Sequence, residues 1–290
     1  GAAGGRPLTT LIRTWRNEAG LDLRPFNTLT ARVDYARVQD LQDYGDSTSV
    51  GRLLQESRQG FLGRNVGFER NRSLNTAISV LPVVASWVRP RATFTSSFAF
   101  NRDPNGRDPV RAGPDSSGGF LVPHTLNNSR RRELGATVDL GTLVRRIAGD
   151  SNAVARLLRG ILPADGSVSR ELRSSFDRAP FSPALRYQLA LGGLGEFRTQ
   201  FSQPATATVL TDTRTLAGGL ELPPGIRVRW NYQDLETSTW VRRGASQVQI
   251  RQISREWPSG SLSWLYTPRW VLGRLVSSIA VQTRYRKAAS

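Results

Sequence analysis

The stretch that decides the fold is Val88–Arg102, Val-Arg-Pro-Arg-Ala-Thr-Phe-Thr-Ser-Ser-Phe-Ala-Phe-Asn-Arg. Its even positions form a largely apolar series: Val88, Pro90, Ala92, Phe94, Ser96, Phe98 and Phe100. Its odd positions form a polar series: Arg89, Arg91, Thr93, Thr95, Ser97, Ala99 and Asn101. Because successive side chains of a strand point to opposite faces, the stretch predicts a strand with one aromatic face and one Arg- and Thr-lined face. It is longer than the about 5–6 residues of a typical globular strand and reaches the about 9–11 that a strand tilted across a bilayer needs.

The same alternation recurs along the chain. Ile226–Tyr232 is the second clear case, with Val228, Trp230 and Tyr232 opposite Arg227 and Arg229. Further strands are expected at Leu29–Tyr35, Leu74–Leu81, Leu134–Leu140, Val168–Phe176, Leu185–Leu191 and Thr206–Leu222, the last with a bulge or bend near Gly218-Gly219. A hairpin is expected from Val248–Ile253 and Leu262–Tyr266 around a tight turn at Trp257–Gly260, followed by a last strand from Ile279 to Tyr285. The pattern therefore predicts an all-β protein, an antiparallel meander of long strands.

Two segments interrupt the alternation. Residues 103–131 are rich in turn-forming Asp-Pro, Asn-Gly and Asn-Asn pairs, which predicts a long loop. Residues 141–163 show helical spacing, which predicts a helical insertion whose second helix starts at Asp150 or Ser151 and ends at Pro163. With its arginines, this insertion is either an amphipathic helix at a lipid surface or a helical hairpin that packs onto the sheet.

Composition limits the function without fixing it. The net charge is +17, almost wholly from arginine because Lys287 is the single lysine. This excess indicates either an anionic partner or a G+C-rich genome. The chain has no cysteine, which excludes a disulfide scaffold, and no apolar run of about 18 residues, which excludes a transmembrane helix but not a transmembrane barrel. The first residues, Gly-Ala-Ala-Gly-Gly without a Met, lead us to expect a fragment of a longer protein.

Residues that could carry chemistry are scarce. His124, inside the predicted long loop, is the only histidine, so we expect no Ser-His-Asp triad, and a histidine without cysteines or clustered carboxylates is a weak metal ligand. Glycine motifs for phosphate or dinucleotide binding are not found between a predicted strand and a helix. We therefore expect no enzyme activity, no cofactor and no metal. Trp257 and Trp270 lie beside predicted turns, which suits an aromatic girdle at a membrane interface better than cross-strand pairing does.

Three readings of the alternation compete. A soluble β-sandwich would show it, as would a soluble basic module that binds nucleic acid, and so would an outer-membrane barrel. Polar residues opposite aromatic ones, very long loops beside tight turns, and about ten to twelve strands favour the barrel. Aromatic residues share a face with aliphatic ones and do not interleave with arginine, which argues against nucleic acid.

Three short motifs resemble one family. Trp87–Arg91, Phe100–Asn105 and Ser254–Gly260 (Ser-Arg-Glu-Trp-Pro-Ser-Gly) are similar to the C-terminal part of SprA/Sov, the outer-membrane translocon of the type IX secretion system, known also from gliding motility. The resemblance spreads over about Leu21 to Tyr266. It implies that residues 1–290 are one segment of a giant barrel. If that barrel has nearly as many strands as the largest known, about 36, this chain would supply about a third of them.

The alternation gives the expected faces of a barrel wall, and the resemblance adds the expected partners. The partners would be outer-membrane lipid, secreted protein substrates, other secretion-system subunits and the remainder of the barrel, with no nucleic acid and a location in the bacterial outer membrane. The alternative is another outer-membrane barrel, such as a nutrient receptor or a lipopolysaccharide-handling protein. The expected lipid-facing residues are Phe94, Phe98, Phe100, Val228, Trp230 and Tyr232; the expected lumen-facing residues are Arg89, Arg91, Thr93, Arg227 and Arg229; the expected girdle residues are Trp257 and Trp270.

Overall fold

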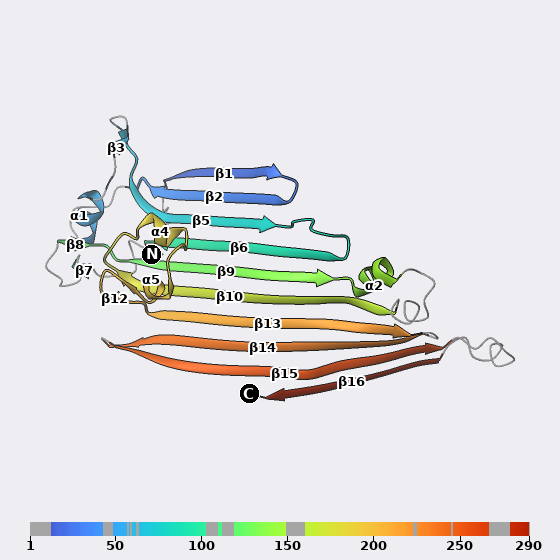
Figure 1. The fold of residues 1–290 in the computed structure, drawn as a ribbon. Coiled ribbons are helices and arrows are strands. Elements are labelled where there is room, and N and C mark those ends of the chain that lie inside the picture. The colour runs from blue at the N-terminus through green and yellow to red at the C-terminus, as the bar shows by residue number, and fades with distance from the viewer. Residues whose placement is uncertain are drawn as a thin grey trace, which may run out of the picture.

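Ten antiparallel strands form one open sheet (Figure 1). The computed structural model describes residues 13–42, 49–56, 58, 60–61, 64–102, 110–111, 119–148, 160–222, 225–244, 246–266 and 279–289. In spatial order the sheet strands are β1 (Thr14–Phe26), β2 (Leu29–Asp40), β5 (Phe68–Val80), β6 (Val88–Asn101), β9 (His124–Val138), β10 (Ile161–Ala179), β13 (Ala207–Leu222), β14 (Ile226–Arg243), β15 (Ser246–Tyr266) and β16 (Ile279–Ala289). Each strand pairs with its predecessor in this order, so the all-β meander expected from the sequence is confirmed.

The connections carry the remaining elements. Short strand pairs are β3 (Gly60–Phe61) with β4 (Arg64–Asn65), β7 (Val110–Arg111) with β8 (Phe120–Leu121), and β11 (Thr199–Gln200) with β12 (Gln203–Pro204). The helices are α1 (Ser49–Glu56), α2 (Leu140–Ala148), α4 (Leu185–Gln188) and α5 (Leu194–Arg198). Within the described part of the chain, none of these helices is long and apolar enough to cross a membrane.

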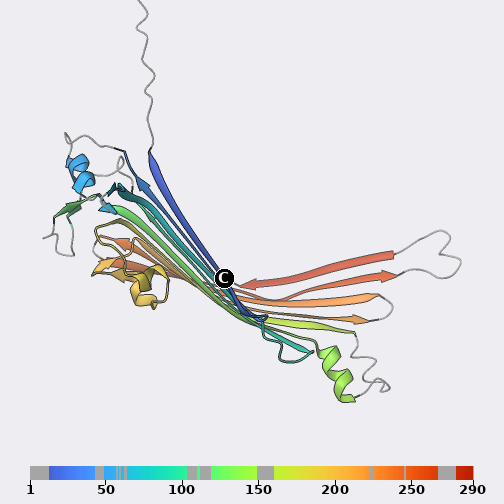
Figure 2. The ribbon, with the colours of Figure 1, turned by 90° about the horizontal axis from the view of Figure 1, so that it is seen from above.

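The sheet has a convex and a concave face. In Figure 2 the strands bend into a wide V, and α2, α4 and α5 lie on its outer side. Directly paired residues share a face, and the register pairs Phe94 with Arg132, Leu134 with Val168, and Leu216 with Tyr232. We call the face that carries these residues the convex face and the opposite one the concave face. Since the period of side-chain direction is two, even positions of β6, β9, β13 and β14 belong to the convex face, as do those of β10 from Ala164 to Phe176, between its two register shifts.

Two of the register shifts in the sheet fall where the sequence predicted a bend or a turn; others occur between β1 and β2, β2 and β5, and β9 and β10. Pro163 and Ala164 of β10 lie between the pairs Leu162–Gly219 and Asp165–Ala217, so that two residues oppose Gly218. The irregularity expected near Gly218 is present, but the extra residue belongs to the neighbouring strand. The second irregularity is at residues 257–258 of β15. The register shifts there against both neighbouring strands, β14 and β16. A bulge leaves a residue out of the ladder, which suits proline because it has no N–H to donate.

Several expected boundaries are therefore corrected. The tight turn at Trp257–Gly260 is wrong, because β15 runs straight through it. The loop at 103–131 is too long, because β9 begins at His124. The insertion at 141–163 starts at Leu140 and is followed by β10 from Ile161, so Pro163 does not end a helix; the start of its second helix, at residues 150–151, lies outside the described residues.

The segment between β10 and β13 is also not a strand. Leu185–Leu191 forms α4 and a turn, and Leu185 and Leu191, the first and last apolar residues of the expected alternation, are exposed. Tyr187, between them, points into the sheet and is 1% exposed. Its ring meets Phe98 edge-on with centroids 6.3 Å apart, and its hydroxyl lies 2.7 Å from Ser174 Oγ. Packing against the sheet therefore overrides the local pattern.

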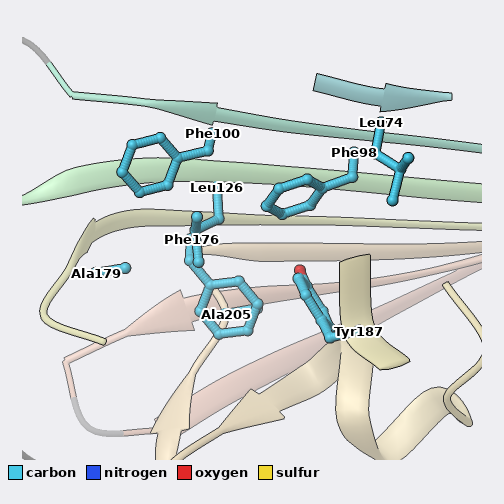
Figure 3. Close-up of a cluster of buried hydrophobic side chains, with 8 residues drawn as sticks. All are labelled: Leu74, Phe98, Phe100, Leu126, Phe176, Ala179, Tyr187 and Ala205. Carbon is cyan, nitrogen blue, oxygen red and sulfur yellow. The ribbon is translucent and has the colours of Figure 1, made fainter. Parts of the chain in front are cut away.

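This segment covers the main core. We call residues 180–206 the cap, since they lie over the convex face at one end of the strands (Figures 1 and 3). The buried side chains beneath and within it are Leu74, Phe98, Phe100, Leu126, Phe176, Ala179, Tyr187 and Ala205 (Figure 3). A smaller cluster joins Leu172 to Ala190 and Phe197. The end of the sheet under the cap is thus sealed from solvent, and the other end is not.

Candidate functional site: the two faces of the curved sheet

A continuous apolar band crosses the uncapped half of the convex face. All ten sheet strands contribute to it, and strand pairing places their side chains side by side. We define the apolar band as Leu21, Leu23, Ala31, Val33, Ile78, Val80, Ala92, Phe94, Leu134, Ala136, Gly166, Val168, Leu216, Leu220, Val228, Trp230, Tyr232, Leu262, Trp264 and Val281. Large members are open: Leu134 is 67% exposed and Val168 is 54% exposed. Soluble monomers rarely show a contiguous apolar surface of this extent.

The length of the band suits a membrane. On β6, Val88 and Pro90 continue the convex apolar series of Ala92 and Phe94, and Val88 to Phe94 measures about 20 Å along the strand at roughly 3.3 Å per residue. The apolar belt of outer-membrane barrels is about 25 Å tall. At the end of the band, the connection from β5 to β6 adds exposed Leu81, Val83 and Val84. Apolar surface therefore continues past the strand ends.

The concave face is polar at the same level. Its residues there are Arg89, Arg91 and Thr93 on β6, Glu133, Gly135 and Thr137 on β9, Asp165 and Ser167 on β10, Thr215 on β13, Arg227, Arg229 and Asn231 on β14, and Ser261 and Ser263 on β15. Hydroxyls, amides and charges line this face, and each opposes an apolar neighbour one residue away on the convex face. Strands of outer-membrane barrels alternate in the same way between apolar and polar residues.

An ion-pair network ties three strands together on the concave face. Arg91 Nη1 and Nη2 donate to the two carboxylate oxygens of Asp165, at 2.6 and 2.9 Å. Thr137 Oγ1 donates to the same carboxylate at 2.7 Å. The guanidinium crosses β9 directly over Gly135, where a Cβ would lie 2.8 Å from Arg91 Cζ. Glycine at this position is what allows the arginine of β6 to reach the aspartate of β10.

The structure places the expected residues as follows. Phe94, Val228, Trp230 and Tyr232 lie on the convex face in the band, where the Trp230 ring covers Gly218. The expected lumen-facing residues, Arg89, Arg91, Thr93, Arg227 and Arg229, all lie on the concave face. Whether lipid and water occupy these faces stays a prediction.

Phe98 and Phe100 are a correction. They share the convex face with Phe94, but they are 0% and 3% exposed because the cap and its core cover them. They cannot face lipid. Alternation along β6 gives the side to which a residue points, but it does not show what covers that side. The side chain of Trp257 and all of Trp270 lie outside the described residues.

His124 belongs to the capped core. It is 2% exposed, its ring lies against Phe100 with centroids 4.6 Å apart, and Nε2 donates to the carbonyl of Phe181. Burial lowers the pKa of His124 to about 4, so the ring is neutral at pH 7. Among the described residues, no group of three His, Cys, Asp or Glu side chains could hold a metal ion.

A row of charges at the edge of the band was not foreseen. We call it the arginine row: Arg132 on β9, Arg170 on β10, Asp212 and Arg214 on β13, Asp234 on β14 and Arg255 on β15. Each strand changes from apolar to charged in a single step of two residues, as from Leu134 to Arg132 and from Val168 to Arg170. The sequence shows this step, but only the register reveals that the steps align across neighbouring strands.

Comparisons with known proteins add little. No family model matches the chain, and no curated protein matches it. Among solved structures the fold is similar to the crystal structure of the Pseudomonas putida toluene transporter TodX, with 9% sequence identity, a TM-score of 0.23, and coverage of 95% of this chain and 68% of the transporter. The similarity to the SprA/Sov family stays a prediction.

Proposed function

We propose that the chain is a wall segment of an outer-membrane β-barrel, with the apolar band in lipid and the concave face toward a water-filled lumen. One observation carries this proposal: the band extends over all ten strands and is backed at the same level by charged and hydroxyl side chains. In water the band would be a large exposed apolar surface, which is unfavourable. In a bilayer the same surface would contact acyl chains, and this free-energy cost would be absent.

The backbone fits the same placement. Inside a bilayer every N–H and C=O group needs a partner from the protein, which strand pairing supplies across this sheet. The exceptions are the two outer edges of the sheet. β1 pairs only with β2, and β16 pairs only with β15, within the described residues. A barrel has no open edges, so the remainder of the barrel is the expected partner at both.

The cargo we propose is secreted protein. Small barrels fill their lumen with side chains, so a protein-conducting channel needs a wall of many strands, of which this open sheet would be one part. A concave face of Arg, Thr, Ser and Asn offers hydrogen bonds to a passing chain without an apolar surface that would retain it. The motifs similar to SprA/Sov direct this finer proposal, including a place in type IX secretion with its other subunits. The role is passage, with no chemistry at any residue and no nucleic acid.

Photo-cross-linking in cells tests the direction of the two faces. A photoreactive residue at Arg229, on the concave face, should capture secreted protein in transit through the full-length protein. The same residue at Val228, its neighbour on the convex face, should capture none. Capture at Val228 but not at Arg229, or equal capture at both, would contradict the proposed wall.

A further inference from the structure

We propose that the arginine row is a binding site for the phosphate groups of membrane lipids at the edge of the apolar band. This inference rests on the proposed membrane position of the sheet. In the row, arginines outnumber aspartates by four to two: Arg132, Arg170, Arg214 and Arg255 against Asp212 and Asp234. Glu236, the residue opposite Asp212, is neutralised by its own ion pair with Arg251. The row thus carries a net positive charge immediately beside apolar surface.

The excess charge is concentrated between β9 and β10. Arg132 and Arg170 are directly opposite each other in the register, which is unfavourable for like charges without an anion between them. Arg170 donates from Nε to Asp212 Oδ1 at 2.6 Å. Arg132 is exposed, and its guanidinium lies over the Phe94 ring at 5.9 Å; among the described residues no carboxylate lies within ion-pair distance of it.

A third arginine backs this pair from beneath the cap. Arg130 is 6% exposed, and its Nη1 donates to the carbonyls of Ala190 and Gly192, at 2.9 and 2.6 Å. Its buried Nε has no hydrogen-bond partner among the described residues. Burial, followed by the charges of Arg132 and Arg170, lowers the pKa of Arg130. Arg132 and Arg170 thus share one paired carboxylate, Asp212, and Arg130 adds a third positive charge that acts on both, so a further anion would stabilise the cluster.

The position of the cluster identifies the anion. A guanidinium group forms paired hydrogen bonds to phosphate oxygens, which makes arginine a preferred phosphate ligand. One step of two residues separates Arg132 from Leu134 and Arg170 from Val168, so the cluster lies where acyl chains on the band would meet their headgroups. At that level of a bilayer the abundant anion is lipid phosphate. A lipid with net negative charge should therefore be preferred over a zwitterionic one.

The test compares two double variants of the full-length protein in nanodiscs of mixed phosphatidylglycerol and phosphatidylcholine. Arg132→Gln with Arg170→Gln removes the cluster. Arg131→Gln with Arg173→Gln is the matched control, because these exposed arginines belong to the same two strands but lie on the concave face: Arg131 is adjacent to Arg132, and Arg173 is three residues beyond Arg170. Lipid that stays bound after extraction into mild detergent is counted by native mass spectrometry.

We expect wild type and control to retain phosphatidylglycerol preferentially, and the cluster variant to lose this preference by about fivefold per arginine removed. Inorganic phosphate should not displace the lipid, since the acyl chains bind the band; displacement by free phosphate would identify an ordinary anion site and overturn the lipid assignment. Equal retention by all three proteins would also overturn the site while leaving the barrel intact. Failure of wild type to enter nanodiscs would instead refute the proposed membrane position, and the site with it.

Discussion

Ala92 and Thr93 offer the sharpest energetic test of the two faces. They are adjacent in β6 and half-buried, and they point to opposite sides of the sheet. Ala92 lies in the band between Val80 and Leu134, whereas Thr93 pairs with Glu133 on the concave face. Arginine on the lipid face of a barrel costs about 2–4 kcal/mol near the bilayer midplane. Since about 1.4 kcal/mol is tenfold in an equilibrium constant, Ala92→Arg should increase the unfolded fraction in lipid by about 30- to 1,000-fold.

Thr93→Arg is the matched control. The new guanidinium would stand opposite the Glu133 carboxylate in the lumen, where surface substitutions change stability by about 0.5 kcal/mol or less. The assay is urea unfolding of the full-length protein in lipid vesicles, followed by tryptophan fluorescence. If both variants unfold at the midpoint of wild type, or if Thr93→Arg is the more damaging, then the band does not face lipid.

Other predictions concern the networks that hold the strands and the cap. Asp165→Asn should cost about 1 kcal/mol, because its ion pair with Arg91 is partly exposed, and a double-mutant cycle with Arg91→Gln should return a similar coupling; zero coupling would contradict the network. The pKa of His124, about 4 when folded against an ordinary 6.5, implies stability that is fully present above pH 6.5 and declines by about 3 kcal/mol as the pH falls through 4. Unfolding titrations at pH 7 and pH 4 measure this, and an undiminished pH dependence in His124→Leu would contradict it. Tyr187→Phe should cost about 1–3 kcal/mol by leaving the Ser174 hydroxyl buried without its partner, and an unchanged unfolding midpoint would refute that role.

The strands and their faces could be predicted from the sequence, because alternation is a local property. Val88–Arg102 shows apolar and polar residues at every second position, and its observed strand, Val88–Asn101, ends within one residue of that expectation. Ile226–Tyr232 indicated its strand equally well, although β14 continues to Arg243. Both assignments depend only on the face of the sheet to which each side chain points. The geometry of an extended backbone determines that face.

What the alternation could not show is which surfaces would be covered. Leu185–Leu191 alternates as well as a true strand, yet it forms a short helix of the cap that packs Tyr187 against the sheet. Phe98 has the same local signature as Phe94, yet one is buried under the cap and the other lies in the band. Residues that favour turns also favour bulges, so Trp257-Pro258 was interpreted as a hairpin where β15 continues. These differences arise from contacts between distant segments.

The most direct measurement is a cysteine scan along β6 of the full-length protein in membranes, probed with a water-soluble thiol reagent and a lipid-phase quencher. Odd positions from Arg89 to Thr93 should react with the aqueous reagent, and even positions from Val88 to Phe94 should be reached from lipid alone. Positions 98 and 100, under the cap, should be protected from both probes. Aqueous labelling at Ala92 and Phe94 equal to that at Arg91 and Thr93 would contradict the account, because the band would then face water.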